Sequence, residues 1–466
     1  MKRVKSVGGI VTVLAILGAL VGCQSPVGGV SAPPRAVTSS GTLIVDKVNG
    51  PYKTIAAGLA AATAGQTVQV HAGVYNEAVA FSASGTSSAP IVLAGDPGAI
   101  IDGSTGVTAE VLVTIDGKSY VKVQGFEIRN RKKNGTSPVP MGILVTGASA
   151  GVEIRNNTVW GIENTNSNGN AHGIAVYGNS STAITGLVID SNEVRNCKLG
   201  WSESMVVNGN VDGFTVSNNV VHDNNNIGID FIGFEGTSSS NDQARNGVCV
   251  GNRVYNISSA SNPAYAGELS ADGIYVDGGK SIVIERNTVD NCDIGIELAS
   301  EHKGKATDNI TVRNNFVSRS YQGNIQMGGY ASNKGKATNL TIVNNTTYQA
   351  TGGELIVQFN TSTVKVSNNV FVAKSGVGYL VQTGSSNTAI SVANNLYYGA
   401  STSSPGAWAD AQALYANPQL VGAPSNLHLQ ASSPAKDRGV VVNYGGFDID
   451  GQARVNGVVD LGADEL

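Results

Sequence analysis

The stretch that decides the fold runs from Asn226 to His302, where one four-residue pattern occurs three times. The copies are GIDF at 228–231, GIYV at 273–276 and GIEL at 295–298. Successive side chains of a β-strand point to opposite faces, so the third position of each copy faces away from the two aliphatic residues. The pattern therefore predicts three short strands with one polar side chain each on their outer face.

If these strands stack in register, the third positions form one outward column of Asp230, Tyr275 and Glu297. Asp277 lies two residues beyond Tyr275 and faces the same side. In the copies farther along the chain the third position is apolar, at Leu144, Ala175, Val206 and Ile356. A face that is merely solvated would be polar throughout, so we interpret the central column as a functional site.

A second pattern, an alternating strand followed by Asn and an apolar residue, recurs along most of the chain. It reads VEIRNNTV from 152, LVIDSNEV from 187, FTVSNNVV from 214, VCVGNRVY from 248, IVIERNTV from 282, ITVRNNFV from 310, LTIVNNTT from 340, VKVSNNVF from 364 and ISVANNLY from 390. Repeats of this length, with two or three short strands each, are typical of a solenoid. We therefore predict an all-β parallel β-helix in which each repeat is one coil.

The repeated Asn has a structural interpretation. Asn tolerates the backbone angles of tight turns, and identical amides stacked in successive coils can hydrogen-bond to one another. We therefore expect the Asn series to hold the coils in register and to take no part in chemistry.

Both ends of the solenoid show capping patterns. The Ala-rich segment 52–63 predicts a short helix before a strand at 67–70 and a turn at 73–75, and such a helix would cover the open end of the stacked sheets. A second short helical pattern covers 407–415, and the tail from Phe447 resembles a closing cap. The predicted domain is 42–466, with an N-terminal cap at about 51–64 and a C-terminal cap at about 405–466.

The N-terminus carries an export pattern. Lys2, Arg3 and Lys5 precede an uncharged apolar run over 7–21, which is typical of a signal peptide. The run ends in LVGC, which resembles a bacterial lipobox and implies lipidation of Cys23. We expect a lipoprotein of the bacterial cell envelope with a signal peptide at 1–23, a flexible tether at 24–41 and a membrane contact through the lipid.

Composition excludes some functions. The formal net charge is -4, and 14% of residues are charged, which disfavours nucleic-acid binding because that function needs a basic face. Apart from Cys23 the chain has three cysteines, Cys197, Cys249 and Cys292. An odd number gives no complete set of disulfides, so we expect them to be buried as small apolar side chains. We expect a monomer.

Three features together resemble a known superfamily: the segment TIAAGLAAATAGQTVQVHAGVYNEAV at 54–79, the repeated coils, and the tail DIDGQAR…DLGADE. They are similar to the right-handed parallel β-helix proteins of the pectin-lyase-like superfamily, over about residues 42–466. The resemblance implies a single-stranded right-handed parallel β-helix and a carbohydrate-active function. It does not name the reaction, because the fold hosts lyases, hydrolases, epimerases and adhesins.

A local resemblance is narrower. DGIYVDGG from 272 and DIGIELASEH from 293 resemble the β-xylosidase-type β-helix glycosidases. That resemblance implies Asp277 as the nucleophile and Glu297 as the acid/base. The loop LASEHKG after Glu297 is longer than the loop of that family and adds Glu301, so the acid/base role is open between Glu297 and Glu301.

The same residues suggest glycoside hydrolysis without the resemblance. Hydrolysis needs two carboxyls, about 5–5.5 Å apart for retention and about 6.5–9.5 Å for inversion. Asp277 and Glu297 belong to adjacent coils about 4.8 Å apart, and Asp230 lies one coil farther from Glu297. Crowded carboxylates raise one another's pKa, which keeps one of them protonated as an acid.

The column has neighbours that suit a sugar. We expect Tyr275 and Gln326 to contact the substrate and Trp201 to offer a stacking face, as could Phe234 and Tyr330. His302 and Lys303 follow Glu301, and Arg245 could reach the site from a loop. The loop HDNNNIGIDFIGFEG from 222 is rich in oxygen ligands, so calcium could bind at Asp230, Glu235 and Asp272, with Glu203 nearby.

Three functions remain open on these residues. The first is a surface-anchored glycoside hydrolase that uses Asp277 and Glu297. The second is a calcium-dependent uronate lyase with Lys303 or Lys305 as the base and Arg245 as a supporting cation. In this sequence Gln326 and Gly328 occupy the positions where such lyases carry basic residues, and this disfavours the lyase function. The third is a non-catalytic surface protein that binds a polysaccharide or oligosaccharide.

Overall fold

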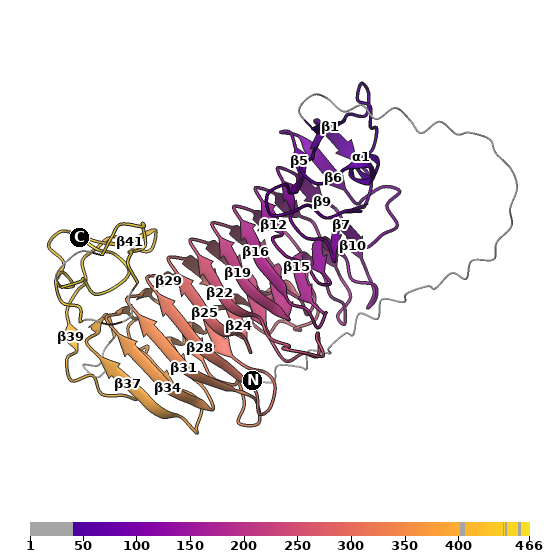
Figure 1. Cartoon of the computed structure of the whole chain (residues 1–466). Coiled ribbons are helices and arrows are strands. Elements are labelled where there is room, and N and C mark those ends of the chain that lie inside the picture. The colour runs from indigo at the N-terminus through magenta and orange to yellow at the C-terminus, as the bar shows by residue number, and fades with distance from the viewer. Residues whose placement is uncertain (1–40, 401–405, 441, 443–444, 455–457) are drawn as a thin grey trace, which may run out of the picture.

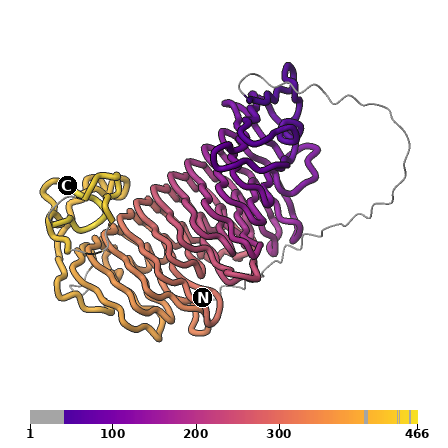
Figure 2. Tube along the Cα trace, viewed as in Figure 1, coloured from indigo at the N-terminus to yellow at the C-terminus, as the bar shows by residue number. Residues whose placement is uncertain are grey.

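The computed structural model describes residues 41–400, 406–440, 442, 445–454 and 458–466. In this range the chain winds into a stack of coils, and each full coil gives one strand to each of three parallel sheets (Figure 1). The coils follow one another along a single axis, with the N-terminal coils at one end and the C-terminal coils at the other (Figure 2). The predicted all-β parallel β-helix is confirmed.

The three sheets are named A, B and C, and their strands are given in chain order. Sheet A holds β1 (Thr42–Val45), β2 (Thr67–Val70), β5 (Ile91–Gly95), β8 (Val121–Gln124), β12 (Glu153–Arg155), β16 (Ile184–Asp190), β19 (Val211–Ser217), β22 (Arg245–Val250), β25 (Lys280–Glu285), β28 (Ala306–Arg313), β31 (Lys336–Val343), β34 (Thr361–Ser367) and β37 (Thr388–Ala393). Sheet B holds β3 (Gly73–Tyr75), β6 (Ala99–Asp102), β9 (Glu127–Arg129), β13 (Thr158–Trp160), β17 (Glu193–Arg195), β20 (Val220–Asn224), β23 (Arg253–Ile257), β26 (Thr288–Cys292), β29 (Phe316–Ser318), β32 (Thr346–Tyr348), β35 (Val370–Val372), β38 (Leu396–Tyr398) and β39 (Leu414–Tyr415). Sheet C holds β4 (Val79–Ala80), β7 (Val111–Asp116), β11 (Met141–Thr146), β15 (His172–Gly178), β18 (Met205–Gly209), β21 (Ile229–Ile232), β24 (Asp272–Asp277), β27 (Ile294–Ala299), β30 (Gly323–Met327), β33 (Gly353–Val357) and β36 (Leu380–Gln382).

Four short strands form two small pairs outside these sheets. They are β10 (Lys132–Lys133) with β14 (Glu163–Asn164), and β40 (Leu420–Gly422) with β41 (Asn426–Leu429). The described residues also contain one α-helix, α1 (Ile55–Ala61), and one 3-10 turn at Ser259–Ser261.

The core is the inside of the coil. Aliphatic side chains at one register position of sheet C stack above one another from coil to coil, all at most 2% exposed: Ile143, Ile174, Met205, Ile229, Ile274, Ile296, Ile325, Leu355 and Leu380. The Ile of each G-I pattern therefore faces inward, as the alternation predicts. Packing of these columns at close to crystal density holds the strands in register.

The repeated asparagines form a ladder in the turn between sheets A and B. The members are Asn157, Asn192, Asn219, Asn252, Asn287, Asn315, Asn345, Asn369 and Asn395, each at most 1% exposed. In every step Oδ1 accepts from the backbone N–H and from Nδ2 of the Asn one coil earlier, at 2.9–3.1 Å. The predicted structural role of this series is confirmed.

An acid ends the ladder and corrects one prediction. Asp410 Oδ2 accepts from the backbone N–H and Nδ2 of Asn395, both at 3.0 Å, and from Tyr397 Oη at 3.0 Å. The helix predicted over 407–415 is therefore wrong, because Asp410 sits in a turn and Leu414–Tyr415 extends sheet B as β39.

The N-terminal end is covered by α1. Ile55 and Leu59 are buried against the first coil, and the predicted capping helix is confirmed within 52–63. Thr54 caps the helix by accepting from Ala57 N at 3.2 Å. The strand predicted at 67–70 is β2, whereas 73–75 is strand β3 and not the predicted turn.

The C-terminal tail lies along the flank of the coils. Asn314 Nδ2 donates to Phe447 O, and Asn344 Nδ2 donates to Asp460 O and Gly462 O. Leu427 and Ala463 pack on Phe316. These contacts place the tail beside coils before the last one, where Figure 1 shows the yellow segment next to the stack.

The cysteines and the N-terminal segment were the subject of further predictions. Cys197, Cys249 and Cys292 are free and buried, as predicted. Cys23, the signal peptide and the tether lie outside the described residues. No described helix has the length and apolarity that crossing a membrane requires.

Candidate active site

The predicted column exists in the predicted register. Asp230 of β21 pairs with Tyr275 of β24, Tyr275 with Glu297 of β27, and Glu297 with Gln326 of β30. Leu144, Ala175 and Val206 continue the column on one side and Ile356 on the other. Asp230, Tyr275, Glu297 and Gln326 thus occupy this position on four adjacent coils, and Thr114 of β7 is a further polar side chain there, separated from them by the three apolar residues.

The column is not an open wall, which corrects the expectation of a flat outer surface. Asp230 and Tyr275 are each 2% exposed, and Glu297 is fully buried. Loops before β18 and β24 cover this part of sheet C. Asn262 fastens the second loop by donating from Nδ2 to Gly200 O at 2.7 Å and to Asn225 O at 2.9 Å.

A cleft of about 50 Å³ remains between these loops and the column. Its carboxyl groups come from five residues: Glu203, Asp230, Glu235, Asp277 and Glu301. Its aromatic side chains are Trp201, Tyr265 and Tyr275, and the rings of Trp201 and Tyr265 lie 4.9 Å apart between centroids. The cleft therefore combines a dense group of acids with flat apolar faces that suit a sugar ring.

Asp277 stands at the corner where β24 ends. Gly278 follows it with a φ of +79°, and a Cβ there would lie 2.9 Å from Gly233 O, so the turn requires glycine. The backbone N–H of Glu301 donates to Asp277 Oδ1 at 2.8 Å. This bond joins the end of β24 to the loop after β27 and brings the Glu301 residue to the cleft.

The pKa of one buried acid of the cleft, Asp230, is strongly raised. Burial raises the pKa of Asp230 well above its ordinary value, and the nearby charges of Glu203, Asp277, Asp272 and Glu235 raise it further. Asp230 Oδ1 is buried without a hydrogen-bond partner among the described residues. A protonated carboxyl in this position is available to donate to a ligand.

The pKa values of two further acids, Glu203 and Glu235, are raised as well. Burial raises the pKa of Glu203 well above its ordinary value, and the charges of Glu235 and Glu301 add to the effect. Burial also raises the pKa of Glu235, although Asn208 Nδ2 donates to its Oε2 at 2.9 Å and opposes the shift. Displaced pKa values of this kind are concentrated at functional sites.

Glu297 lies outside the lining of the cleft. Its Oε1 accepts a hydrogen bond from Gln326 Nε2 at 2.9 Å, and both residues are buried beside each other on successive coils. The structure thus brings Asp230, Asp277 and Glu301 to the cleft and leaves Glu297 and Gln326 next to it.

The predicted cationic contacts are not brought together there. Arg245 Nη2 forms a salt bridge with Asp212 at 3.1 Å, at the start of sheet A strands. Lys303 is exposed, and the Lys305 ammonium lies 5.0 Å above the ring of Phe234. None of these cations lines the cleft. Trp201 does line it, as expected.

The predicted calcium ligands are also divided. Asp230 and Glu235 border the cleft, whereas Asp272 is fully buried in β24 and does not. The described ligand atoms that cluster within 4.8 Å here belong instead to Glu235, Asp277 and His302. Because this set includes an imidazole and calcium prefers oxygen ligands only, the three residues do not suit calcium.

Sequence reasoning missed Tyr265 and Ser270, which also line the cleft. Both belong to the linker 258–271 between β23 and β24, whereas the linker between β20 and β21 covers only 225–228. The length of this insertion, directly before the GIYV copy, was the available signal.

The family described as right handed beta helix region matches residues 141–334 and 269–404, which together span more than half of the chain. The chain belongs to the right-handed β-helix family. The predicted handedness is thereby confirmed, and the parallel coils described above are those of this family.

Relatives of this β-helix protein are known in sequence and in structure. The uncharacterized protein YwoF of Bacillus subtilis (strain 168) is 37% identical over 358 residues, which cover 75% of this chain and 76% of that protein. Pectate lyase Pel9A has a TM-score of 0.50 at 15% identity and covers 90% of this chain and 92% of its own. XylC in complex with xylose has a TM-score of 0.50 at 12% identity, with 91% and 98% covered. At these identities the two structures show the shared fold alone.

Proposed function

We propose that this protein is a glycoside hydrolase whose cleft on sheet C cleaves a glycosidic bond with Asp277 and Glu301. The observation that carries the proposal is the hydrogen bond from Glu301 N to Asp277 Oδ1, which holds two carboxyl-bearing residues at one cleft. Glycoside hydrolysis needs two carboxyl groups, one on either side of the glycosidic bond.

The roles follow from the surroundings of each acid. A backbone N–H favours the ionised form of a carboxyl, so Asp277 is assigned the nucleophile or base role. Glu301 lies in the same cleft and is half-buried, and it is assigned the proton donor role. Asp230, whose pKa is raised by burial, keeps its proton and donates to a substrate hydroxyl.

The lining also argues for a neutral sugar. Its charged side chains are carboxyls, with no Lys or Arg among the described lining residues. The ionised Asp277 proposed here would repel a uronate, whereas the hydroxyls of a neutral sugar can hydrogen-bond both to this carboxylate and to the protonated acids. A lyase would need a base and a cation there, and Lys303, Lys305 and Arg245 lie elsewhere. A neutral saccharide is therefore the proposed substrate class.

The test compares three matched variants on a panel of plant and microbial polysaccharides. Asp277→Asn and Glu301→Gln are each expected to lower kcat by a factor on the order of 10²–10⁴. Glu297→Gln is the control, because a glutamine can still accept from Gln326, and it is expected to keep most of the activity. Loss in Glu297→Gln with full activity in Glu301→Gln would transfer the acid role to Glu297.

The product distinguishes hydrolysis from elimination. Hydrolysis releases reducing ends without the ultraviolet absorbance of an unsaturated uronide. Growth of that absorbance, abolished by a chelator and restored by calcium, would reject the hydrolase in favour of the calcium-dependent lyase. Saturable binding of a glycan without cleavage would favour the non-catalytic binding protein.

We further propose that Cys23 carries a lipid that anchors the enzyme to the cell envelope, with 24–41 as the tether. Cys23→Ala is expected to move the protein from the membrane fraction to the soluble fraction. An unchanged membrane fraction would reject the anchor.

A further inference from the structure

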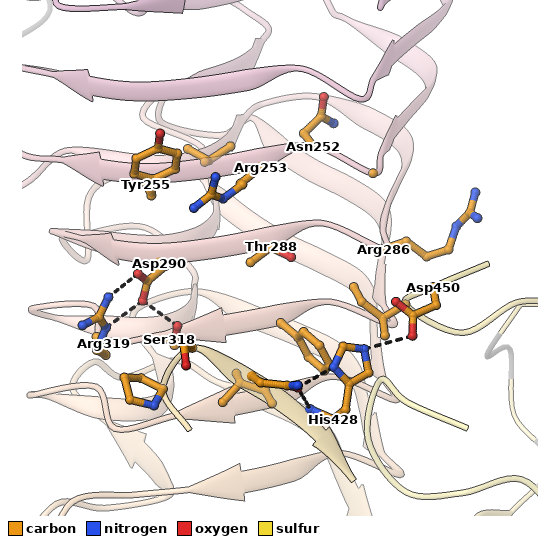
Figure 3. A pocket seen from close by; sticks show the side chains of 18 of the residues that line it. Asn252, Arg253, Tyr255, Arg286, Thr288, Asp290, Ser318, Arg319, His428 and Asp450 are labelled. Atoms are coloured by element: carbon orange, nitrogen blue, oxygen red, sulfur yellow. Dashed lines mark hydrogen bonds and ion pairs between the residues drawn. The ribbon is translucent and has the colours of Figure 1, made fainter. Parts of the chain in front are cut away.

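A second and larger groove lies on sheet B, away from the cleft on sheet C. It encloses about 940 Å³, within the size range of ligand sites in proteins. One wall consists of β23, β26 and β29, and the other consists of the C-terminal segments 424–428 and 449–450 (Figure 3). The groove thus exists because the C-terminal tail lies along the coils.

The tail wall is firmly attached. Leu427 packs against Phe316, and the His428 ring meets the Phe316 ring edge-on with centroids 5.0 Å apart. His428 Nε2 lies 2.9 Å from Asp450 Oδ2. The side chains at this wall are held in place, so the groove has a defined shape before any ligand arrives.

Two arginines of the other wall, Arg253 and Arg286, have no acidic partner among the residues that the structure describes. The Arg253 guanidinium lies 4.4 Å above the ring of Tyr255, which is itself stacked on His222 with ring centroids 4.7 Å apart. The Arg286 guanidinium lies 5.8 Å from the Phe447 ring, and its Nε is buried without a hydrogen-bond partner within the described part of the chain. Among the described residues neither guanidinium forms a salt bridge, whereas the neighbouring Arg319 does so with Asp290.

We propose that this groove binds an anionic polysaccharide, with uronate carboxylates held by Arg253 and Arg286. An arginine on an aromatic ring is preorganised to bind a carboxylate through two parallel hydrogen bonds. Arg253 pairs in register with Thr288 of the adjacent coil, so Arg286 lies one coil along the axis and two residues to the side, and the two guanidinium groups offer two separate positions for carboxylates along the groove. Thr288, Ser318 and Asn426 between and beside them offer groups that bind sugar hydroxyls.

The charge balance favours carboxylates over phosphates. Asp290 and Asp450 also line the groove, and their charges oppose a densely charged polyanion. A uronate polymer carries a single negative charge on each sugar and suits two separated arginines better. The groove therefore takes a chemical class of saccharide different from the one proposed for the acidic cleft.

The experiment measures binding of oligogalacturonate to the full chain by titration calorimetry. The double variant Arg253→Gln/Arg286→Gln is expected to weaken binding about tenfold or more. The matched control is Arg195→Gln, because Arg195 lies over the Trp160 ring in the same sheet but outside the groove, and its Kd is expected to stay within about twofold. Thermal unfolding of each variant checks that the fold is intact.

Other probes define the ligand and the outcomes that overturn the inference. A neutral xylo-oligosaccharide is expected not to compete with oligogalacturonate for the groove. Inorganic polyphosphate that binds more tightly than oligogalacturonate would reject the uronate assignment. Absence of saturable uronate binding, or equal binding by the double variant and the wild type, would reject the groove as a site. Loss of hydrolysis in Asp277→Asn leaves this test unaffected, so the two proposals fail separately.

Discussion

Asp277 and Glu297 belong to adjacent coils of sheet C, but their carboxyl groups have different environments. Asp277 is the last residue of β24 and reaches the cleft, where it accepts the N–H of Glu301. Glu297 occupies a mid-strand position of β27 and accepts from Gln326 of β30 on the neighbouring coil. Both are almost completely buried, yet only Asp277 borders space for a ligand.

Glu354 is a buried acid outside the cleft. It is fully buried in β33, where Asn324 Nδ2 donates to Oε2 at 2.7 Å and the backbone N–H of Ala350 donates to Oε1 at 3.0 Å. Burial raises the pKa of Glu354 from 4.5 to about 7 despite these bonds. The protonated form is therefore favoured in the folded state.

This shift predicts how stability depends on pH. Because the folded pKa is above the unfolded one, the contribution of Glu354 is complete below pH 4.5 and is lost as the pH rises through about 7. The loss is on the order of 3 kcal/mol. Glu354→Gln should remove it, so that the free energy of unfolding of the variant falls less between these pH values. Denaturant unfolding at several pH values measures both slopes, and equal slopes would contradict the assignment.

At the scale of elements, the Asn ladder ties successive coils through buried amides. Asn287 is typical: Oδ1 accepts from N and Nδ2 of Asn252, and Nδ2 donates to Cys249 O and to Asn315 Oδ1. Both amide groups are satisfied in a fully buried turn, so the ladder is a cooperative network.

Removal of one Asn from the ladder should lower the free energy of unfolding. Asn287→Ala leaves the N–H of Asn252 and the carbonyl of Cys249 without their partners, and we expect a loss of stability on the order of 3 kcal/mol. Asn49→Ala, at an exposed loop position, is the control and should change stability by less than about 0.5 kcal/mol. Chemical denaturation measures both values. A loss of the same size at both positions would show that the ladder adds nothing beyond local turn propensity.

At the scale of the whole molecule, the tail is joined to the coils by a buried charge. The Arg454 side chain has no exposed surface, and its Nη1 lies 2.6 Å from Glu465 Oε2. Its Nε and Nη2 donate to Asn314 Oδ1 at 3.1 and 2.9 Å. Arg454 therefore fastens the tail to the flank of the solenoid, where the tail forms one wall of the groove.

Breaking this connection should loosen the tail and spare the coils. Arg454→Met leaves Glu465 without its cation, which costs about 3–5 kcal/mol. Because contacts in a solenoid are mainly between neighbouring coils, we expect faster hydrogen exchange in residues 445–454 and 458–466 and unchanged exchange in β15 to β24. Arg454→Met/Glu465→Met should recover part of the loss. Uniformly faster exchange along the chain would contradict this separation.

The sequence was sufficient to predict the coils and their register. Alternation with period two and a repeated Asn are local signals, and each copy confirms the next, so Asp230, Tyr275, Glu297 and Gln326 could be aligned in advance. The prediction of a helix at 407–415 was wrong because Asp410 accepts a hydrogen bond from the backbone N–H of Asn395, and no local sequence pattern reveals this contact.

The sequence by itself determined the stack of coils, because repeated short strands bury their aliphatic side chains in only one common register. Only the tertiary structure decided which acids line the cleft. The loop 258–271 has no period, and its path over sheet C depends on Asn262 reaching Gly200, which lies 62 residues away in the chain. The same holds for the tail, whose distant contacts turn one flank of the solenoid into a groove.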